Sequence, residues 1–204
     1  MAVPKHLALP HFNGTFSLQG VPYALRKVFK LAKIKLNIVV EPIGPDDAES
    51  KYRFIIKSSI IGLGVFGAAP LRAVGFPTEN SDERILDGSE QDKDEPVIGK
   101  TKSRIWLCLL EEVLTGAKDG SSTTTSGGEG IAQTDDFLKQ DWEGHDAGKT
   151  YVVRLSIWSV NPGESEPWRN EQVWGIQKGR WTGRVAFTKG AVKETARLMY
   201  DYES

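Results

Sequence analysis

The chain has 204 residues, of which 39% are hydrophobic and 26% are charged, and its formal net charge is −1. These values are typical of one globular domain, so residues 1–204 are treated as a single domain. The near-neutral charge gives no basic field that would attract nucleic acid. No run of about 18 apolar residues occurs, so no membrane span is predicted.

The N-terminal part predicts one strand followed by one helix. Residues 12–18 have the composition of a strand, and residues 21–33 have apolar side chains at helical spacing. Pro22 fits the first turn of such a helix, because the N–H that proline lacks has no partner there. The basic residues of this helix are expected either as a solvated face or as a basic lid over the fold.

Strands are predicted through the middle of the chain. Residues 34–41 and 52–58 alternate apolar and polar side chains, which indicates half-buried antiparallel strands. Residues 105–110 are apolar throughout and predict a strand that is covered on both faces. Residues 80–95 are rich in acids and are predicted as a polar link, and residues 118–130 are predicted as a flexible loop because of their Ser, Thr and Gly content.

The last quarter of the chain predicts three strands joined by tight turns. Residues 151–160 lead into strands at 168–176, 180–188 and 191–202, and the last three are separated by Lys178-Gly179 and Lys189-Gly190. Glycine takes the positive φ that two-residue hairpins need. We therefore predict a mainly β fold: an antiparallel up-and-down, calycin-like β-barrel with one N-terminal helical lid, which would enclose a cavity for a small molecule.

The two predicted turns fix which side chains share a face. They place Trp174 opposite Gly183, and Val185 between Gln172 and Glu194. This face is the more apolar one and should point inward, provided that no bulge intervenes. The opposite face carries Glu171 and Arg184, which are expected to form an exposed cross-strand ion pair.

Glu194 is the candidate catalytic residue, together with Gln172. A carboxylate among apolar side chains loses hydration, its pKa rises, and it can act as a general acid. The alternative is that Glu194 lies at the mouth of the barrel and is solvated. Candidate ligand-contacting residues are those on the apolar face, which form either an aromatic wall for a flat or cationic ligand or ordinary core packing: Trp174, Trp181, Val185, Tyr200, Tyr52 and Phe54.

Other motifs argue against nucleotide, metal and disulfide sites. Residues 62–67 match the pattern GxGxxG, but no amphipathic helix follows to receive a pyrophosphate. The three histidines, His6, His11 and His145, lack metal-ligand spacing. The single cysteine, Cys108, is expected as buried apolar filler. No cofactor is expected, and with no signal-peptide pattern a reducing, cytoplasmic location is predicted.

Both ends of the chain resemble a family of small fungal lipocalin-like proteins, related in shape to the fatty-acid-binding branch of the calycins. The matching stretches are 18–21 leading into Arg26-Lys27, then 171–175, 180–182, 188–190 and 196–202. Family members often carry a second basic residue beside the position of Arg184, where this chain has Gly183, which leaves more room for a bulky ligand. Some members are cofactor-free cyclases of secondary metabolism, and the resemblance implies that activity.

The resemblance implies one specific reaction, the intramolecular hydroalkoxylation of a prenylated aromatic polyketide. Glu194 would protonate the alkene, the aromatic wall would stabilise the cation, and Gln172 would orient the phenol. The main alternative is a non-catalytic carrier of fatty acids or other small lipophilic ligands, and a third is a partner-binding scaffold with a large exposed apolar patch. A carrier of carboxylates needs an inward arginine, and the predicted register places Arg184 and Arg197 outward, which favours the cyclase.

Overall fold

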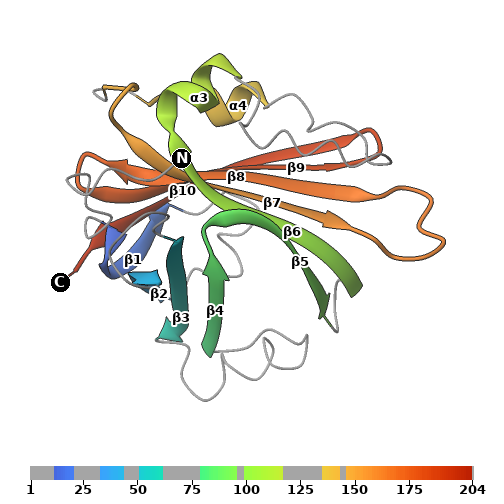
Figure 1. Cartoon of the computed structure of the whole chain (residues 1–204), viewed down its shortest axis with the longest axis horizontal. Helices are drawn as coiled ribbons and strands as arrows, with labels where there is room; N and C mark the ends of the chain where they lie inside the picture. The colour runs from blue at the N-terminus through green and yellow to red at the C-terminus, as the bar shows by residue number, and fades with distance from the viewer. Residues whose placement is uncertain are drawn as a thin grey trace.

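The computed structural model describes residues 12–20, 33–43, 51–61, 79–95, 99–116, 135–142 and 146–203. Residues 21–32 of the helix predicted at 21–33, the GxGxxG stretch, the loop at 118–130 and the three histidines lie outside these residues, and Lys33 begins β2. Ten strands are described (Figure 1): β1 (Gly14–Gly20), β2 (Lys33–Ile43), β3 (Lys51–Ile61), β4 (Glu79–Ile85), β5 (Asp87–Glu95), β6 (Gly99–Leu109), β7 (Tyr151–Ser159), β8 (Trp168–Gln177), β9 (Arg180–Lys189) and β10 (Val192–Tyr202).

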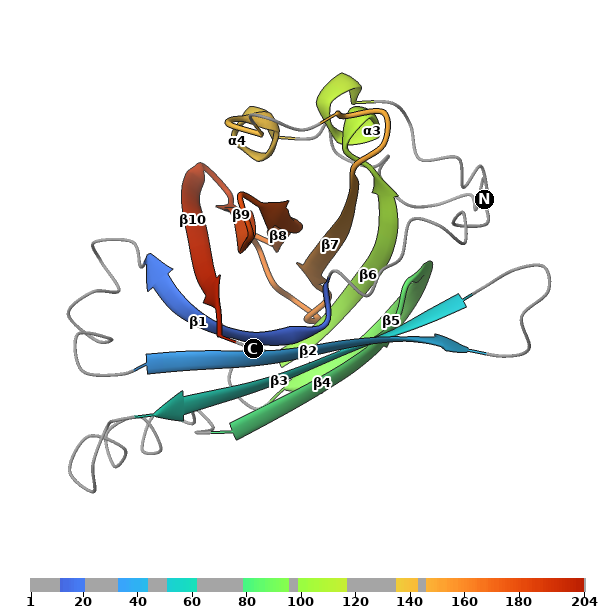
Figure 2. The ribbon, with the colours of Figure 1, turned by 90° about the vertical axis from the view of Figure 1, so that its left-hand side faces the viewer.

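All ten strands pair antiparallel in the order β4-β3-β2-β1-β10-β9-β8-β7-β6-β5. The sheet curls, so that β1 to β4 lie across from β6 to β10 (Figure 2). Apolar side chains from both halves meet between them in one core, which includes Ile38, Phe54, Ile105, Val153 and Trp181. The predicted mainly antiparallel β fold is therefore confirmed. A closed barrel is not found in the described residues, because β4 and β5 are the two edges of the sheet and no ladder joins them.

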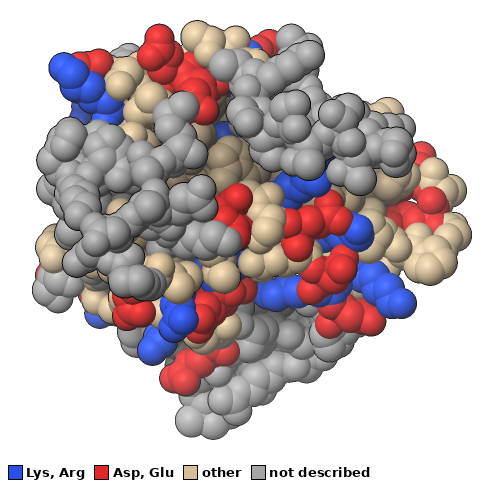
Figure 3. Space-filling view, viewed as in Figure 1, with Lys and Arg blue, Asp and Glu red and all other residues tan. Residues whose placement is uncertain are grey.

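The prediction of a polar link at residues 80–95 was wrong, because these residues form β4 and β5. Their outward side chains are charged rather than apolar, and ion pairs replace apolar contacts between neighbouring strands. Glu90 of β5, for example, accepts hydrogen bonds from Lys102 and, at 3.2 Å, from Arg104 of β6. Acidic and basic side chains are intermixed on this face of the molecule (Figure 3). An edge strand of this composition has no apolar alternation by which it could be recognised.

The first of the two predicted C-terminal hairpins is confirmed. Lys178 and Gly179 both have positive φ, and Trp174 lies opposite Gly183. The second turn was placed wrongly: it consists of Gly190 and Ala191, so that Val185 lies opposite Ala196 rather than Glu194. Gly190, with φ of 55°, takes the first turn position, which favours glycine in one of the two common hairpin turns. This change moves the cross-strand partners of β9 along β10 by two residues. Because side chains alternate with a period of two, the same side chains still share each face of the sheet.

The outer face of β6 to β9 is covered by two short helices, α3 (Leu110–Thr115) and α4 (Asp136–Lys139), which the sequence did not predict. They form a second core with the sheet, made of Cys108, Leu110, Val113, Leu138, Trp142, Val152, Val173 and Ala186. Asp135 caps α4 by accepting a hydrogen bond from the Phe137 amide at 2.9 Å. Cys108 is buried as predicted. None of the helices described is long and apolar enough to cross a membrane.

Candidate ligand pocket

A pocket of about 320 Å³ lies inside the curled sheet, near the seam between β4 and β5. Its volume falls at the lower end of the range for small-molecule sites. Six strands, β4 to β9, supply its lining: Arg84, Lys93, Thr101, Ser103, Ile157, Trp168, Asn170 and Phe187. Polar groups therefore gather on the β4–β6 side, and apolar groups on the β7–β9 side.

Arg84 is the central charged group of the pocket. Its side chain comes from the inner face of β4, directly opposite Phe54 of β3, and only 8% of it is exposed. Its Nε donates a hydrogen bond to Asp82 Oδ2 at 2.7 Å, and its Nη1 donates to Ser103 Oγ at 2.5 Å. Its Nη2 has no hydrogen-bond partner among the described residues. Nε and Nη1 are thus engaged, and Nη2 is the guanidinium nitrogen that can donate to an acceptor in the pocket that Arg84 lines.

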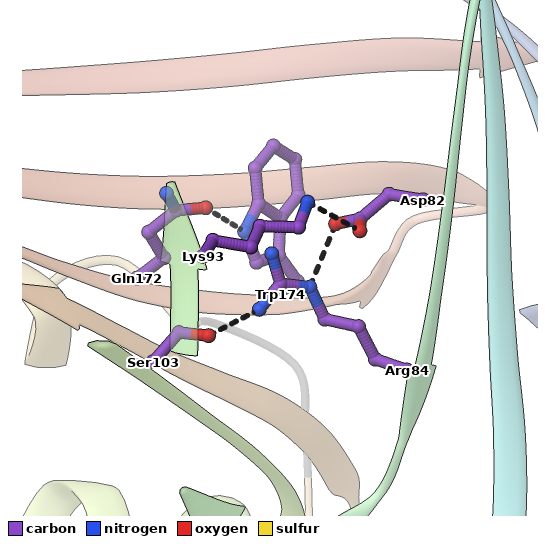
Figure 4. A network of polar contacts seen from close by, with 6 residues as sticks. All are labelled: Asp82, Arg84, Lys93, Ser103, Gln172 and Trp174. Atoms are coloured by element: carbon purple, nitrogen blue, oxygen red, sulfur yellow. Dashed lines mark hydrogen bonds and ion pairs between the residues drawn. The ribbon is translucent and has the colours of Figure 1, made fainter. Parts of the chain in front are cut away.

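A second cation joins the two edges of the sheet. Lys93 Nζ of β5 lies 3.0 Å from Asp82 Oδ1, so that Asp82 receives both Lys93 and Arg84 (Figure 4). The Asp82 carboxylate thus bridges β4 and β5, where no backbone ladder does. Two cationic side chains, Arg84 and Lys93, thus meet at one carboxylate beside the pocket.

The opposite wall is apolar with one polar group. Trp168 and Phe187 pack against each other with ring centroids 5.8 Å apart, and Ile157 lies beside them on β7. Asn170 is the polar group on this side, and its Oδ1 accepts a hydrogen bond from Gln172 Nε2 at 3.2 Å. The lining therefore suits a ligand with an acidic head and an apolar body.

None of the eight sequence-predicted site residues lines this pocket. The aromatic residues among them instead pack together in the inner core. Trp174 stacks on Trp181 with centroids 5.8 Å apart, and it lies 6.2 Å from the ring of Tyr200. Phe54 lies 6.3 Å from Trp181, and Tyr52 packs against the same cluster. The contacts described for these aromatic residues are therefore contacts within the inner core.

The two predicted catalytic residues lie apart. Gln172 is fixed by its neighbours, because its Oε1 accepts a hydrogen bond from Trp174 Nε1 at 2.7 Å and its amide nitrogen binds Asn170. Glu194 is on the inward-facing register of β10, but it is exposed, and it lies opposite Phe187 rather than Val185.

Gly183 does not leave extra room for a ligand. A Cβ at this position would lie within 2.5 Å of Cη2 of Trp174, and the indole already occupies the space above the glycine. The absence of a side chain at residue 183 thus serves the packing of Trp174 across the inner face of β9.

Arg184 does not form the predicted exposed pair with Glu171. Its side chain is fully buried under Trp142, with the guanidinium carbon 3.7 Å from the indole centroid. Glu171 pairs instead with Arg169 at 2.6 Å and accepts a hydrogen bond from Ser156 at 2.7 Å. The prediction failed because it assumed a wet outer face, and the segment after α4 covers that face.

Burial of Tyr200 gives a testable pH dependence. Desolvation raises the pKa of its phenol to about 12. Because ionisation is harder in the folded state than in the unfolded state, the folded protein should lose stability between about pH 10 and pH 12. The loss is on the order of 2–3 kcal/mol, at about 1.4 kcal/mol per pKa unit. Urea unfolding of the wild type and Tyr200→Phe should show a stability difference that shrinks over this pH range, and a constant difference would contradict the assignment.

Sequence reasoning missed Arg84, Lys93 and Ser103 because they belong to strands with weak or charged patterns. One signal was present: Ser103 and Thr101 alternate with charged residues just before the apolar run at 105–110, which is typical of a strand. Nothing local indicated that β4 turns Arg84 inward, since that orientation depends on the distant register with β3.

Comparisons with known proteins give no family for this mainly β chain with a polar inner pocket. No family model matches it, and no curated protein matches it. Among solved structures, it is similar to secretory abundant heat soluble protein 4 from Ramazzottius varieornatus, with 10% sequence identity and a TM-score of 0.40 over 95% of each chain. A likeness at this level identifies neither the family nor the function of the chain.

Proposed function

We propose that this protein is a non-catalytic carrier of a small amphipathic anion, a carboxylate with an apolar body. The observation that carries the proposal is the buried guanidinium of Arg84, whose Nη2 has no described partner and which lines a pocket with an apolar far wall. An ionised acceptor makes a stronger hydrogen bond with such a donor than a neutral one does. The carboxylate would sit beside Arg84 and Ser103, and the apolar body would lie on Trp168 and Phe187.

The curled sheet and the seam suit this role. In our proposal the sheet forms a calycin-like cup whose β4 and β5 edges are tied by Asp82 and Lys93. A reducing compartment such as the cytoplasm suits its single cysteine, Cys108. A carrier of carboxylates needs an arginine that points inward, and in our proposal this residue is Arg84. It lies in β4, within the residues 80–95 that were predicted as a polar link.

The cyclase implied by the family resemblance depends on a desolvated acid at Glu194. Glu194 is exposed, and none of the aromatic residues assigned to stabilise a cation lines the pocket. The carrier function requires no such acid, so the geometry favours it over the cyclase.

Arg84→Met is expected to weaken the binding of decanoate while leaving the binding of decanol nearly unchanged. Losing one charged hydrogen bond, of about 1.5–3 kcal/mol, should raise the Kd of decanoate about 10- to 100-fold. Intrinsic tryptophan fluorescence would report the titrations, because Trp168 is one of the six tryptophans and lines the pocket. Asp82 keeps Lys93 as a partner in this variant, so the change does not leave an unpaired carboxylate.

Arg104→Met is the matched control, because Arg104 has the same charge but binds Glu90 on the outer face of β6. Its decanoate affinity should match that of the wild type. Equal loss in both variants would indicate a general charge effect, and unchanged affinity in Arg84→Met would refute the proposed role of Arg84.

A further inference from the structure

Two arginines lie directly opposite each other on the outer face of the sheet, on the far side from the pocket. Arg184 of β9 pairs with Arg197 of β10 in the ladder. Like charges in this position repel each other, so the arrangement costs stability unless an anion lies between them. Burial, and next the charge of Arg197, lower the pKa of Arg184 to about 10, which is the direction expected of an undercompensated cation.

The anion that the structure places there is the carboxylate of Asp141, and it is a poor match. Its Oδ2 contacts Nη2 of Arg197, while Arg184 receives only the Asp141 backbone carbonyl, at 2.7 Å from its Nη2, and Gln177 Oε1 at 3.3 Å. Asp141 also has a φ of 55°, a left-handed conformation that is uncommon for a residue other than glycine.

Three buried N–H groups of the pair have no acceptor among the described residues. They are Nε and Nη1 of Arg184 and Nε of Arg197. Arg184 is fully buried, and the Trp142 ring lies against one face of its guanidinium. Each buried donor without an acceptor carries a desolvation cost of about 1–3 kcal/mol. Native structures rarely retain such groups without a reason, and an unfilled anion site is one such reason.

We propose that Arg184 and Arg197 form a binding site for a small phosphate-type oxyanion, and that the Asp141 carboxylate occupies this site when the anion is absent. A carboxylate offers two oxygens in one plane, and the Asp141 carboxylate leaves three donors of the two arginines unpaired. A tetrahedral dianion offers acceptors in several directions and two negative charges for two guanidinium groups.

Access to the site comes from the side of Arg197. The side chains of Arg197 and Asp141 are 37% and 53% exposed. An incoming anion therefore displaces the Asp141 carboxylate into water and takes over its contact with Arg197. In our proposal the anion also accepts hydrogen bonds from the unpaired donors of Arg184, whose guanidinium is covered on one face by the Trp142 ring.

The Asp141→Asn variant gives the sharpest test. Asparagine tolerates positive φ and has no competing charge, so the Kd for inorganic phosphate should fall about fivefold or more relative to the wild type. Arg197→Gln should raise that Kd at least tenfold. Both would be measured by calorimetry at constant ionic strength, with sodium chloride as the balancing salt. Arg180→Gln is the control, because Arg180 pairs with Asp201 and makes none of the contacts of the site.

A second measurement uses the wild-type protein and therefore does not depend on whether a variant folds. The Nε–H resonance of Arg184 in a ¹⁵N-edited spectrum should shift on saturation with phosphate and should not shift with acetate at the same concentration. O-phosphoserine in the same titration distinguishes a phosphate monoester from free phosphate as the ligand. Binding as tight as that of phosphate assigns the site to phosphate monoesters as well, and weaker binding assigns it to the free anion. Both results support an oxyanion site.

Three results would overturn the proposal. The first is the absence of any saturable effect of phosphate beyond that of chloride. The second is weaker phosphate binding in Asp141→Asn, which would make the carboxylate part of the site rather than its competitor. The third is equal binding of acetate and phosphate, which would contradict the tetrahedral dianion.

Discussion

Gly183→Ala is expected to destabilise the protein by about 2–3 kcal/mol, the cost of forcing extra atoms into a packed core. The new methyl group would overlap the six-membered ring of Trp174, and that indole is held by its stack on Trp181 and its hydrogen bond to Gln172. The sign of the effect is informative. Glycine within a strand costs about 0.5–1 kcal/mol relative to alanine, so without the overlap the substitution would stabilise the sheet.

Urea unfolding would measure this effect, and near-UV circular dichroism would report the change in the Trp174–Trp181 stack. Gly148→Ala is the matched control, because a Cβ at this exposed position would meet only the flexible ends of two side chains, Glu111 at 3.3 Å and Asp146 at 3.7 Å. The double variant Gly183→Ala with Trp174→Leu should recover part of the lost stability relative to the sum of the two single changes. A neutral or stabilising Gly183→Ala would show that Trp174 does not occupy the space above residue 183.

Trp142→Ala is expected to cost about 3–5 kcal/mol, the range for removing a large aromatic side chain from a core. The ring covers Arg184, packs over Gly175, and donates a hydrogen bond from Nε1 to the Leu138 carbonyl at 2.9 Å. The same change opens the second core, because Leu138 of α4 would lose its neighbour.

Unfolding by urea and hydrogen exchange of the α4 amides would test this prediction. Trp158→Ala serves as a comparison, because Trp158 lies on the same face of the sheet but packs only partly, with Arg104 and Arg169 near its ring. The comparison variant should lose much less stability than Trp142→Ala. Equal losses, or unchanged exchange at α4, would show that Trp142 does not hold the helix on the sheet.

Local patterns were sufficient to predict most strands and one hairpin. The Lys178-Gly179 turn fixed the pairing of β8 with β9 because both residues adopt the positive φ that the turn type requires. Residues 105–110 are all apolar, which correctly indicated a strand that is covered on both faces. Ile105 of this strand lies in the inner core and Cys108 lies in the outer core. The inward face of β8 to β10 was also predicted correctly, because a two-residue slip preserves alternation.

The site could not be predicted, because it depends on contacts between distant strands. Arg84 becomes buried only when β4 pairs with β3 and Ser103 of β6 comes across the seam. Arg184 becomes buried only because Asp141 and Trp142, 43 and 42 residues earlier in the chain, fold back onto β9. Neither event has a local signature. The charged composition of residues 80–95 predicts exposure of Arg84, and the position of Arg184 on the less apolar face of its strand predicts exposure of Arg184.

The acidity of β4 and β5 has a consequence for self-association. These two strands are the edges of the sheet, and an edge presents unpaired backbone groups that can recruit a strand from another copy of the chain. β4 carries Glu79, Asp82 and Glu83, and β5 carries Asp87, Glu90, Asp92, Asp94 and Glu95. Two such edges repel each other when two molecules meet. The stretch that lacks a strand pattern in the sequence thus also disfavours the addition of a strand from a second molecule at either of the two described edges.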